Sequence, residues 1–440
     1  MIQDESRPPS AESLKRSKVF CAAPWTSVNL TNDGQVLPCC FMTPPPGSAP
    51  DLRQGDVADA CNSILWRSLR RDMLAGKESS ACSGCYEKER LDISSPRLGY
   101  RLDRPILDAV SKTRPDGILE KIQPLLIQLI FSNKCNFRCR TCDPWRSSAW
   151  VEEAKRLGAD IRFWPSSDGP PIGGHQVDFQ IYKSTDKPGG LWEQIEPFLQ
   201  GLEEISIAGG EPLLEEENLV LLKRLIAKKK TDIMLFYNTN FSITQFAGDD
   251  VFRLWKRFKK VVIAASVDGS GRRGEYLRTG FRWAQLLRNR ERLAAVCPDV
   301  EFVVQPTVSV MNVLHIPDFY RELLDHKVIG IDQVGTSMPL VRTPPEYSVQ
   351  VLPPRLKRKV LEEYKSFALE LVVKYGRRGA AKTEFFARTL PRFMMASDQQ
   401  RLLPDFRERT ALLDRSRGES FADVFPELAE LVPAAADGGS

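Results

Sequence analysis

Three of the ten cysteines of this chain lie within eight residues, in the segment NKCNFRCRTCDPW. Cys135, Cys139 and Cys142 have C-x3-C-x2-C spacing and directly follow the apolar run 125–131, which we expect to be a buried strand. A structural zinc site would need a fourth ligand nearby, and none of the three histidines is adjacent in sequence. Three thiolates fit an iron–sulfur cluster that keeps one iron open to an external ligand.

Composition indicates an ordinary soluble protein, because 42% of the 440 residues are hydrophobic and 27% are charged. No apolar run approaches the roughly 18 residues of a membrane span, and the charged N-terminus lacks the apolar region of a secretory signal. We therefore expect a cytoplasmic protein, in which clustered thiols stay reduced and bind metal. A net charge of +5 gives no reason to expect a nucleic-acid partner.

Four segments follow from the distribution of cysteine, proline and apolar residues along the chain. The central one alternates short apolar runs with amphipathic stretches, as in βα units. The last is Arg-rich with helical periodicity. We predict a flexible tail (1–18), a cysteine-rich module with its connector (19–120), an α/β core (121–340) and a helical C-terminal extension (341–440).

The core should contain six parallel strands, two fewer than a closed TIM barrel, so we predict a partial (βα)6 TIM-like barrel. In a parallel sheet the reactive groups lie at the carboxyl ends of the strands. A Gly- and Pro-rich insertion at 158–190 is expected to be either a functional lid or disordered. The expected strands are 125–131, 205–208, 233–237, 261–267, 302–310 and 328–334.

Four further cysteines form two pairs in the N-terminal module. Cys21 and Cys39 bracket a C-x12-G-x4-C pattern, and Cys82 and Cys85 form a C-x2-C pair. Four thiolates can hold either a fully ligated cluster or zinc, and the spacing does not choose between them. Cys40 could replace Cys39 as the ligand.

The loop CNFRCRTC resembles the cysteine loop of the radical SAM superfamily. This resemblance implies a 4Fe–4S cluster on Cys135, Cys139 and Cys142, whose open iron is chelated by S-adenosylmethionine. Reductive cleavage of that cofactor would give a 5′-deoxyadenosyl radical that takes hydrogen from a substrate. AGGEP, YNTN, SVDG and EYLR resemble other superfamily motifs, which implies cofactor-binding roles for Gly209, Gly210, Glu211, Pro212, Asn238, Asn240, Ser266, Asp268 and Arg278. The resemblance also implies such a role for Asn312, which follows the fifth expected strand.

The N-terminal module resembles the SPASM/twitch auxiliary-cluster module of the same superfamily, in its CxxPW, DG, PCC and Cys-x2-Cys-x4-Arg elements. This resemblance implies a second, auxiliary 4Fe–4S cluster on Cys21, Cys39, Cys82 and Cys85. The module departs from most relatives because it precedes the core. Its four ligands match the twitch count, so a single auxiliary cluster is expected.

These resemblances imply an oxidoreductase-like radical SAM enzyme, most readily one that dehydrogenates or crosslinks a ribosomally synthesised peptide. A flavodoxin or ferredoxin would donate the electrons. Dehydrogenation or epimerisation of a sugar, aminocyclitol or other small metabolite is the alternative within the superfamily. A non-catalytic zinc-binding protein is the alternative from another class.

Overall fold

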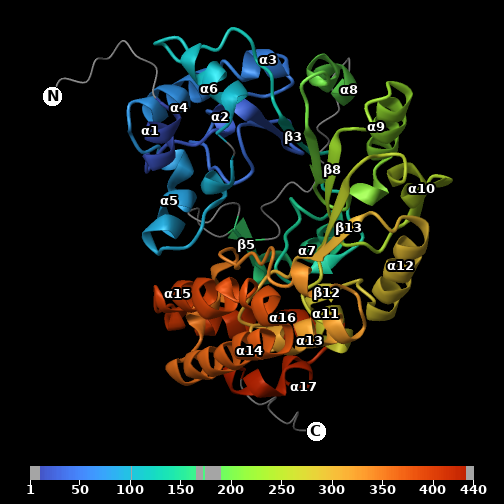
Figure 1. Ribbon diagram of the computed structural model, residues 1–440. Coiled ribbons are helices and arrows are strands. Elements are labelled where there is room, and N and C mark those ends of the chain that lie inside the picture. The colour runs from blue at the N-terminus through green and yellow to red at the C-terminus, as the bar shows by residue number, and fades with distance from the viewer. Residues whose placement is uncertain (1–9, 101, 165–171, 174–189, 433–440) are drawn as a thin grey trace. The chain divides into compact units, whose positions relative to one another are not determined.

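The computed structural model describes residues 10–100, 102–164, 172–173 and 190–432 (Figure 1). Its internal contacts divide the chain into two compact units. The first comprises Met1–Ser132, Tyr182–Tyr237 and Arg257–Val261, and the second comprises Asn133–Ile181, Asn238–Lys256 and Val262–Ser440. This division runs through the 121–340 segment, so the four-segment organisation stays a prediction.

A parallel sheet runs through the first unit. Strand β3 (Leu126–Ile130) pairs in parallel with β7 (Glu204–Ala208) on one side and with β1 (Ser27–Leu30) on the other. On the far side of β7, β8 (Met234–Thr239) pairs in parallel, and β2 (Val36–Leu37) closes an antiparallel hairpin with β1. The prediction of an α/β chain with a parallel sheet is confirmed. β1 was not predicted, so the cysteine-rich module contributes a strand to the sheet.

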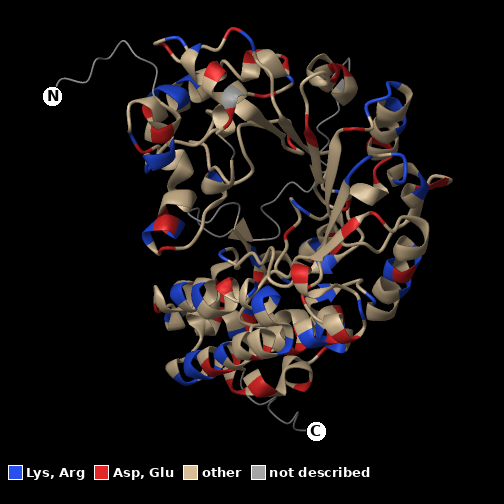
Figure 2. Ribbon diagram, viewed as in Figure 1, with Lys and Arg blue, Asp and Glu red and all other residues tan. Residues whose placement is uncertain are grey.

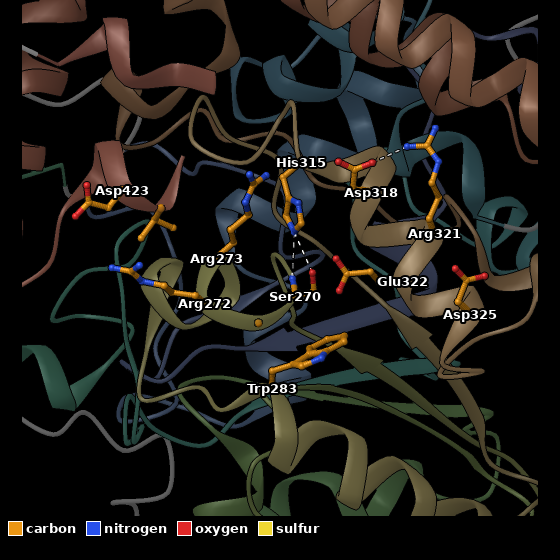
Figure 3. Close-up of a pocket in the computed structure, with 12 residues that line it drawn as sticks. Ser270, Arg272, Arg273, Trp283, His315, Asp318, Arg321, Glu322, Asp325 and Asp423 are labelled. Carbon is orange, nitrogen blue, oxygen red and sulfur yellow. Dashed lines mark hydrogen bonds and ion pairs between the residues drawn. The ribbon is translucent and has the colours of Figure 1, made fainter. Parts of the chain in front are cut away.

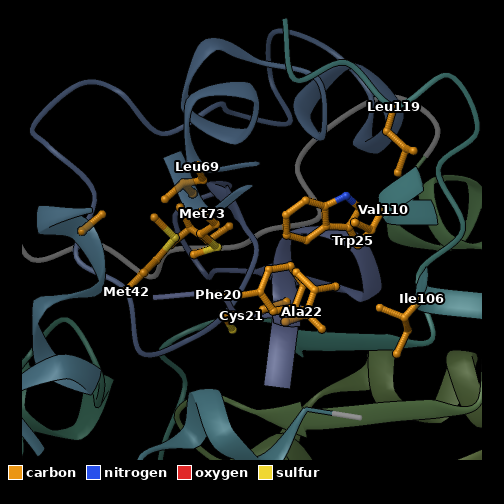
Figure 4. Packing of buried hydrophobic residues seen from close by; sticks show 14 of the residues in the cluster. Phe20, Cys21, Ala22, Trp25, Met42, Leu69, Met73, Ile106, Val110 and Leu119 are labelled. Carbon is orange, nitrogen blue, oxygen red and sulfur yellow. The ribbon is translucent and has the colours of Figure 1, made fainter. Parts of the chain in front are cut away.

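Short helices pack around the start of β1: α2 (Ala23–Thr26), α4 (Ile64–Leu74) and α6 (Arg104–Ser111). The ring of Trp25 stacks on Phe20 with centroids 5.3 Å apart and donates its Nε1–H to the Thr113 hydroxyl at 2.8 Å (Figure 4). Both aromatic rings are buried, which stabilises the backbone next to Cys21. Helix α1 (Ala11–Arg16) lies within the predicted flexible tail and buries Leu14 in the same core.

The second unit contains the parallel pair β11 (Val261–Ala265) and β13 (Glu301–Val304). Helices α11 (Gly271–Leu277), α12 (Trp283–Val296) and α13 (Ile316–Asp325) follow these strands. β13 is shorter than the predicted strand at 302–310, because Pro306 has no N–H to continue a ladder.

The prediction of a sixth strand at 328–334 is wrong. A short 3-10 helix, Ile331–Gln333, occupies this segment. The Gln333 side chain accepts from the Gly330 N–H at 3.0 Å, while the Gln333 N–H donates to the Gly330 carbonyl at 3.1 Å. These local bonds favour a turn, and the buried residues Val328, Ile331 and Val334 recur every third position, as a 3-10 helix requires.

Helices dominate the chain after Pro339: α14 (Pro354–Ala380), α15 (Leu390–Met395), α16 (Leu403–Arg417) and α17 (Phe421–Val424). Basic and acidic residues are both present along α14 and α16 (Figure 2). Within the predicted insertion, β5 (Arg162–Phe163) pairs with β6 (Ile172–Gly173). The rest of that insertion, 165–171 and 174–189, lies outside the described residues, as do 1–9 of the predicted tail.

Candidate functional site

The loop that carries Cys135, Cys139 and Cys142 is held by buried hydrogen bonds from its own residues. Ser147 Oγ donates to the Phe137 carbonyl at 2.6 Å, and Trp150 Nε1 donates to the Cys139 carbonyl at 2.9 Å. The Cys142 N–H closes the turn onto the Cys139 carbonyl at 3.0 Å. These bonds fix the backbone of the loop, and none of its three thiols is in a disulfide.

The three thiols lie close enough to influence one another. Burial raises the pKa of Cys142 well above its usual value, and the neighbouring charges of Asp143, Cys139 and Cys135 raise it further. Burial also raises the pKa of Cys139, whereas Arg278 lowers it. A buried thiol cluster of this kind favours metal ligation over unligated thiolates, because the metal supplies the compensating charge.

An arginine of the second unit faces this loop. Strand β4 (Arg138–Cys139) pairs with β12 (Arg278–Thr279), which sets Cys139 opposite Arg278. Nη1 of Arg278 lies 3.6 Å from Cys139 Sγ, while Nε of Arg278 lies 2.7 Å from Asp268 Oδ2. The guanidinium therefore joins a cysteine to a carboxylate residue that is 2% exposed.

Asp268 is itself fixed by the loop after β13. Its Oδ1 accepts from the Thr307 N–H at 2.7 Å, and its backbone carbonyl accepts from Asn312 Nδ2 at 2.9 Å. Asn312, which is fully buried, also donates to the Thr307 carbonyl at 3.0 Å. Three residues expected at the cofactor site, Asp268, Arg278 and Asn312, are thus one hydrogen-bonded group beside Cys139.

The end of β8 contacts the cysteine loop through amides. Asn240 Nδ2 donates to Asn136 Oδ1 at 2.8 Å, and Asn136 Nδ2 donates to Ser242 Oγ at 3.0 Å. Ser242 Oγ completes the triangle by donating to Asn240 Oδ1 at 2.7 Å. Asn136 and Ser242 were not predicted as site residues, although their polar side chains closely follow a motif cysteine and the YNTN motif.

Asn238 and Ser266 both belong to the second unit and are partly exposed. The Ser266 N–H donates to the Thr239 carbonyl at 2.7 Å, which ties the end of β11 to the end of β8.

The Gly209–Pro212 motif ends β7 in the first unit. Gly209 has φ of 131°, and a Cβ there would lie 3.0 Å from the Ser132 carbonyl oxygen, so a side chain is excluded by both backbone and space. The Gly210 N–H donates to that same carbonyl at 3.2 Å. Glu211 is fully buried, and its Oε1 accepts from the Leu213 N–H at 3.1 Å. The motif is therefore a hydrogen-bonded bend at the end of β7, in which Gly209 is exposed and Glu211 is buried.

The four cysteines of the N-terminal module are placed by different elements of the first unit. Cys21 precedes α2, and Cys39 follows β2. Cys85 lies on α5 (Ser83–Arg90), and Cys82 is the residue that caps its N-terminus. The β1–β2 hairpin turns at Gly34, whose φ of 88° explains the glycine of the C-x12-G-x4-C pattern.

Side-chain bonds connect the segment before Cys21 to α5. Tyr86 OH donates to the Val19 carbonyl at 3.3 Å, and Arg97 Nη1 donates to the Phe20 carbonyl at 2.5 Å. Arg97 Nε also donates to Glu89 Oε1 at 2.9 Å, one helical turn after Cys85. The segment that carries Cys21 and the helix that carries Cys85 are thereby held together.

The thiols of this module also interact. Burial raises the pKa of Cys21 to about 12, with smaller contributions from Cys82 and Cys85. Burial likewise raises the pKa of Cys39, to which the charges of Cys21, Cys40 and Cys82 add. Cys40 is an exposed residue; burial raises the pKa of its thiol, and the Gln128 side chain lowers it. Cys39 therefore interacts with two of the other expected ligands, Cys21 and Cys82, whereas Cys40 interacts with one, Cys85.

The two remaining cysteines are buried away from these groups. Cys61 is 0% exposed, and burial raises its pKa to about 12. The Cys297 thiol donates to the Phe252 carbonyl at 2.8 Å. Neither position offers an accessible thiol.

A cavity of about 600 Å³ in the second unit is lined by the N-terminus of α11, by Trp283 and by one face of α13 (Figure 3). In its wall, Ser270 Oγ lies 3.2 Å from His315 Nε2, which also accepts from the Ser270 N–H at 3.3 Å. Burial lowers the pKa of His315 to about 4, so the ring is neutral. No described residue accepts from His315 Nδ1, so the pair lacks the orienting acid of a catalytic triad.

Within the described ranges, no three His, Cys, Asp or Glu side chains are arranged as ligands of a single metal ion. A 4Fe–4S cluster is held differently, because each thiolate binds its own iron and the sulfurs stand farther apart. Two separate sets of reduced, mutually interacting thiols are the donors that such clusters need. None of the described helices has both the length and the hydropathy required to cross a bilayer.

One region of the chain matches a known protein family. Residues 21–86 match the SPASM family, an iron–sulfur cluster-binding domain. No curated protein sequence matches the chain significantly.

Among solved structures, native anSMEcpe with bound AdoMet is 20% identical, with a TM-score of 0.37, over 57% of this chain and 62% of that one. A histidine-tagged form of anSMEcpe with bound AdoMet is 17% identical over 57% and 60%, with a TM-score of 0.35. SuiB of Streptococcus suis bound to precursor peptide SuiA is 15% identical over 68% and 59%, with a TM-score of 0.32. The alignments span about three-fifths of these proteins.

Proposed function

We propose that this chain, whose residues 21–86 match the SPASM iron–sulfur cluster-binding domain, is a radical SAM enzyme. Cys135, Cys139 and Cys142 would hold the cluster that binds S-adenosylmethionine, and Cys21, Cys39, Cys82 and Cys85 would hold the auxiliary cluster. When bound, the first cluster and S-adenosylmethionine would supply an electron and a 5′-deoxyadenosyl radical that abstracts hydrogen from the substrate.

The observation that carries this proposal is the cysteine loop with its arginine. Three interacting thiols lie on one hydrogen-bonded loop, and the Arg278 guanidinium lies 3.6 Å from one of them. A cluster with three thiolates is anionic, and a cation held beside its sulfur stabilises that charge. A second, separate set of four thiols is then available for a fully ligated auxiliary cluster.

The chain's own polar groups would orient the cofactor. Arg278 offers N–H donors for a carboxylate, and its ion pair with buried Asp268 fixes the direction of the guanidinium. In the first unit, Gly209 and Gly210 carry no side chain that would block the approach of a ligand to their backbone, and their contact with the cofactor rests on the motif alone. Asn238, Asn240 and Ser266 supply neutral donors and acceptors suited to hydroxyl groups.

A ribosomally made peptide is the proposed substrate class, and an oxidative modification the proposed outcome. The resemblance of the N-terminal module to SPASM/twitch enzymes supports both, because a fully ligated auxiliary cluster can accept an electron. A sugar or aminocyclitol is the second candidate substrate. Epimerisation needs a thiol hydrogen donor, and the burial of Cys61 and Cys297 disfavours it.

The test is anaerobic reconstitution followed by reduction with dithionite in the presence of S-adenosylmethionine. We expect about eight irons per chain, as two 4Fe–4S clusters require, and release of 5′-deoxyadenosine. Bound zinc without iron, and no cleavage of the cofactor, would instead identify a zinc-binding protein. A product lighter by two hydrogens from a candidate peptide, but not from sugars, would settle the substrate class.

A further inference from the structure

The arginine between the second and third cysteines of the loop is buried against the C-terminal helix. Arg140 is 0% exposed, and its Nη2 donates to Asp414 Oδ1 and to Glu419 Oε2, each at 2.6 Å. Its guanidinium also stacks on Tyr276, with 3.6 Å from Cζ to the ring centroid. The Tyr276 hydroxyl donates to the same Asp414 oxygen at 2.7 Å. Two residues at the end of α16 and just beyond it therefore neutralise a cation of the cysteine loop.

An arginine of α16 itself forms a second connection to the cysteine loop. Arg417 Nη2 donates to Glu153 Oε2 at 2.9 Å, and both side chains are at most 2% exposed. Glu153, on α7 (Val151–Leu157), also pairs with Arg138 at 3.4 Å, the residue just before Cys139. Arg417 additionally donates to Thr279 Oγ1 at 2.9 Å, in the strand opposite Cys139. Arg138 and Arg140, which flank Cys139, are thus both paired with acidic side chains. Helix α16 takes part in both connections, through Arg417 at Glu153 and through Asp414 at Arg140.

Backbone bonds add to the connection at Arg140. Its N–H donates to the Leu277 carbonyl at 2.9 Å, and its Nε donates to the Tyr276 carbonyl at 3.2 Å. Arg140 is therefore fixed at its backbone N–H, its Nε and its Nη2, whereas its Nη1 has no hydrogen-bond partner among the described residues. A displacement of Arg140 would move Cys139 and Cys142 relative to each other, because only Thr141 separates it from the latter.

We propose that the end of α16 is a positioning element of the three-cysteine site, in which Asp414 and Glu419 hold Arg140 and so set the spacing of Cys139 and Cys142. This inference rests on the proposed function for its catalytic meaning, but the physical link does not require a bound cluster. A buried guanidinium without its carboxylates is strongly unfavourable, so the loop leaves this conformation when both acids are neutralised.

The test is hydrogen–deuterium exchange on the cluster-free full chain carrying Asp414→Asn and Glu419→Gln. We expect amides of residues 139–150 to exchange about tenfold faster than in the unchanged protein, as expected for a local opening. Amides of β1 should keep their rates. Glu408→Gln, an exposed acid on the same helix, is the matched control and should change neither region.

Equal acceleration of exchange at 139–150 and in β1 would mean that Asp414 and Glu419 contribute only to general stability. Unchanged exchange at 139–150 would mean that they do not hold the loop. Either result overturns the proposal. Tyr276→Phe provides a milder variant, since it removes only the hydroxyl that donates to Asp414. It should accelerate exchange at 139–150 by about threefold. No acceleration in this folded variant would also count against the link.

Reconstitution separates this inference from the proposed function. The double acid variant should retain about four irons per chain, those of the auxiliary cluster, and should lose the spectral change that S-adenosylmethionine causes. If the unchanged protein itself fails to cleave S-adenosylmethionine while the exchange result holds, the enzyme assignment fails and the positioning element remains.

Discussion

Nη1 of Arg278 lies 3.6 Å from Sγ of Cys139, directly across the short β4–β12 pair. The same guanidinium forms an ion pair with Asp268, which is nearly inaccessible to solvent. One arginine therefore contacts both a fixed carboxylate and a cysteine sulfur, and its loss should be felt at both.

Replacing Arg278 by Gln should lower the free energy of unfolding by about 3 kcal/mol, because Asp268 keeps its burial but loses its cation. Denaturant unfolding of the cluster-free protein measures this. Release of 5′-deoxyadenosine by the reconstituted variant should fall as well. Arg272→Gln, at an exposed position of α11, is the control and should change stability little. Equal losses in the two variants would contradict the role given to the Asp268 pair.

Changing Cys82 and Cys85 together to Ala should reduce the iron content from about eight to about four per chain. Cleavage of S-adenosylmethionine should remain measurable, because the three-cysteine loop belongs to a separate set of ligands. Formation of the oxidised product should stop. Product formation at the original rate would remove the auxiliary cluster from the mechanism.

Cys39 and Cys40 can be distinguished by single changes to Ser. The charges of Cys21 and Cys82 raise the pKa of Cys39, whereas Cys85 is the module cysteine that raises the pKa of Cys40. We expect Cys39→Ser to lose or destabilise the auxiliary cluster and Cys40→Ser to keep it, as measured by iron content and by the absorbance near 400 nm, an approximate band position for such clusters. The opposite result would make Cys40 the ligand.

Folding stability should fall as the pH drops from about 6.5 toward about 4, because of His315. Burial lowers its pKa from 6.5 to about 4, so in this interval the unfolded chain binds a proton that the folded chain does not. The stability contributed by the neutral His315 ring is complete above the pKa of the unfolded chain, and it is lost as the pH falls through the lower pKa of the folded chain. Arg273 lowers this pKa further, while Asp318 opposes it.

The difference of about 2.5 pH units corresponds to about 3 kcal/mol in all. Urea unfolding of the cluster-free protein at pH 7.5, 6.5 and 5.5 is the measurement, with His315→Gln as the comparison. The variant should show a shallower decline over this interval. Parallel declines in both proteins would assign the pH dependence to other groups.

Strands were predicted correctly from the sequence where a local apolar pattern matches the burial of the residues in the structure. The apolar runs before the cysteine loop, before the Gly209 motif and before Asn238 became β3, β7 and β8, because each alternates or is wholly apolar and is buried. The resemblance of the N-terminal cysteine module to SPASM/twitch modules is confirmed by the SPASM family match over residues 21–86. Such features depend on residues close together in the chain.

Contacts between distant segments could not be predicted in this way. β1 pairs with β3 almost one hundred residues later, and SVNL alone is too short to signal a strand. The reciprocal bonds of Gly330 and Gln333 turned an apolar run into a 3-10 helix. Nothing in the sequence near Arg140 indicates its partners, because Asp414 and Glu419 lie more than 270 residues later in the chain.

The most direct test of the central claim is electron paramagnetic resonance of the reduced Cys82→Ala/Cys85→Ala variant, with and without S-adenosylmethionine. In this variant the auxiliary cluster is removed, so the observed signal comes from the three-cysteine cluster. The account predicts a 4Fe–4S spectrum whose g-values shift when S-adenosylmethionine is added, since the iron without a cysteine is open to the cofactor. A spectrum that is unchanged by the cofactor, from a cluster whose fourth iron is already bound by a protein side chain, would contradict it.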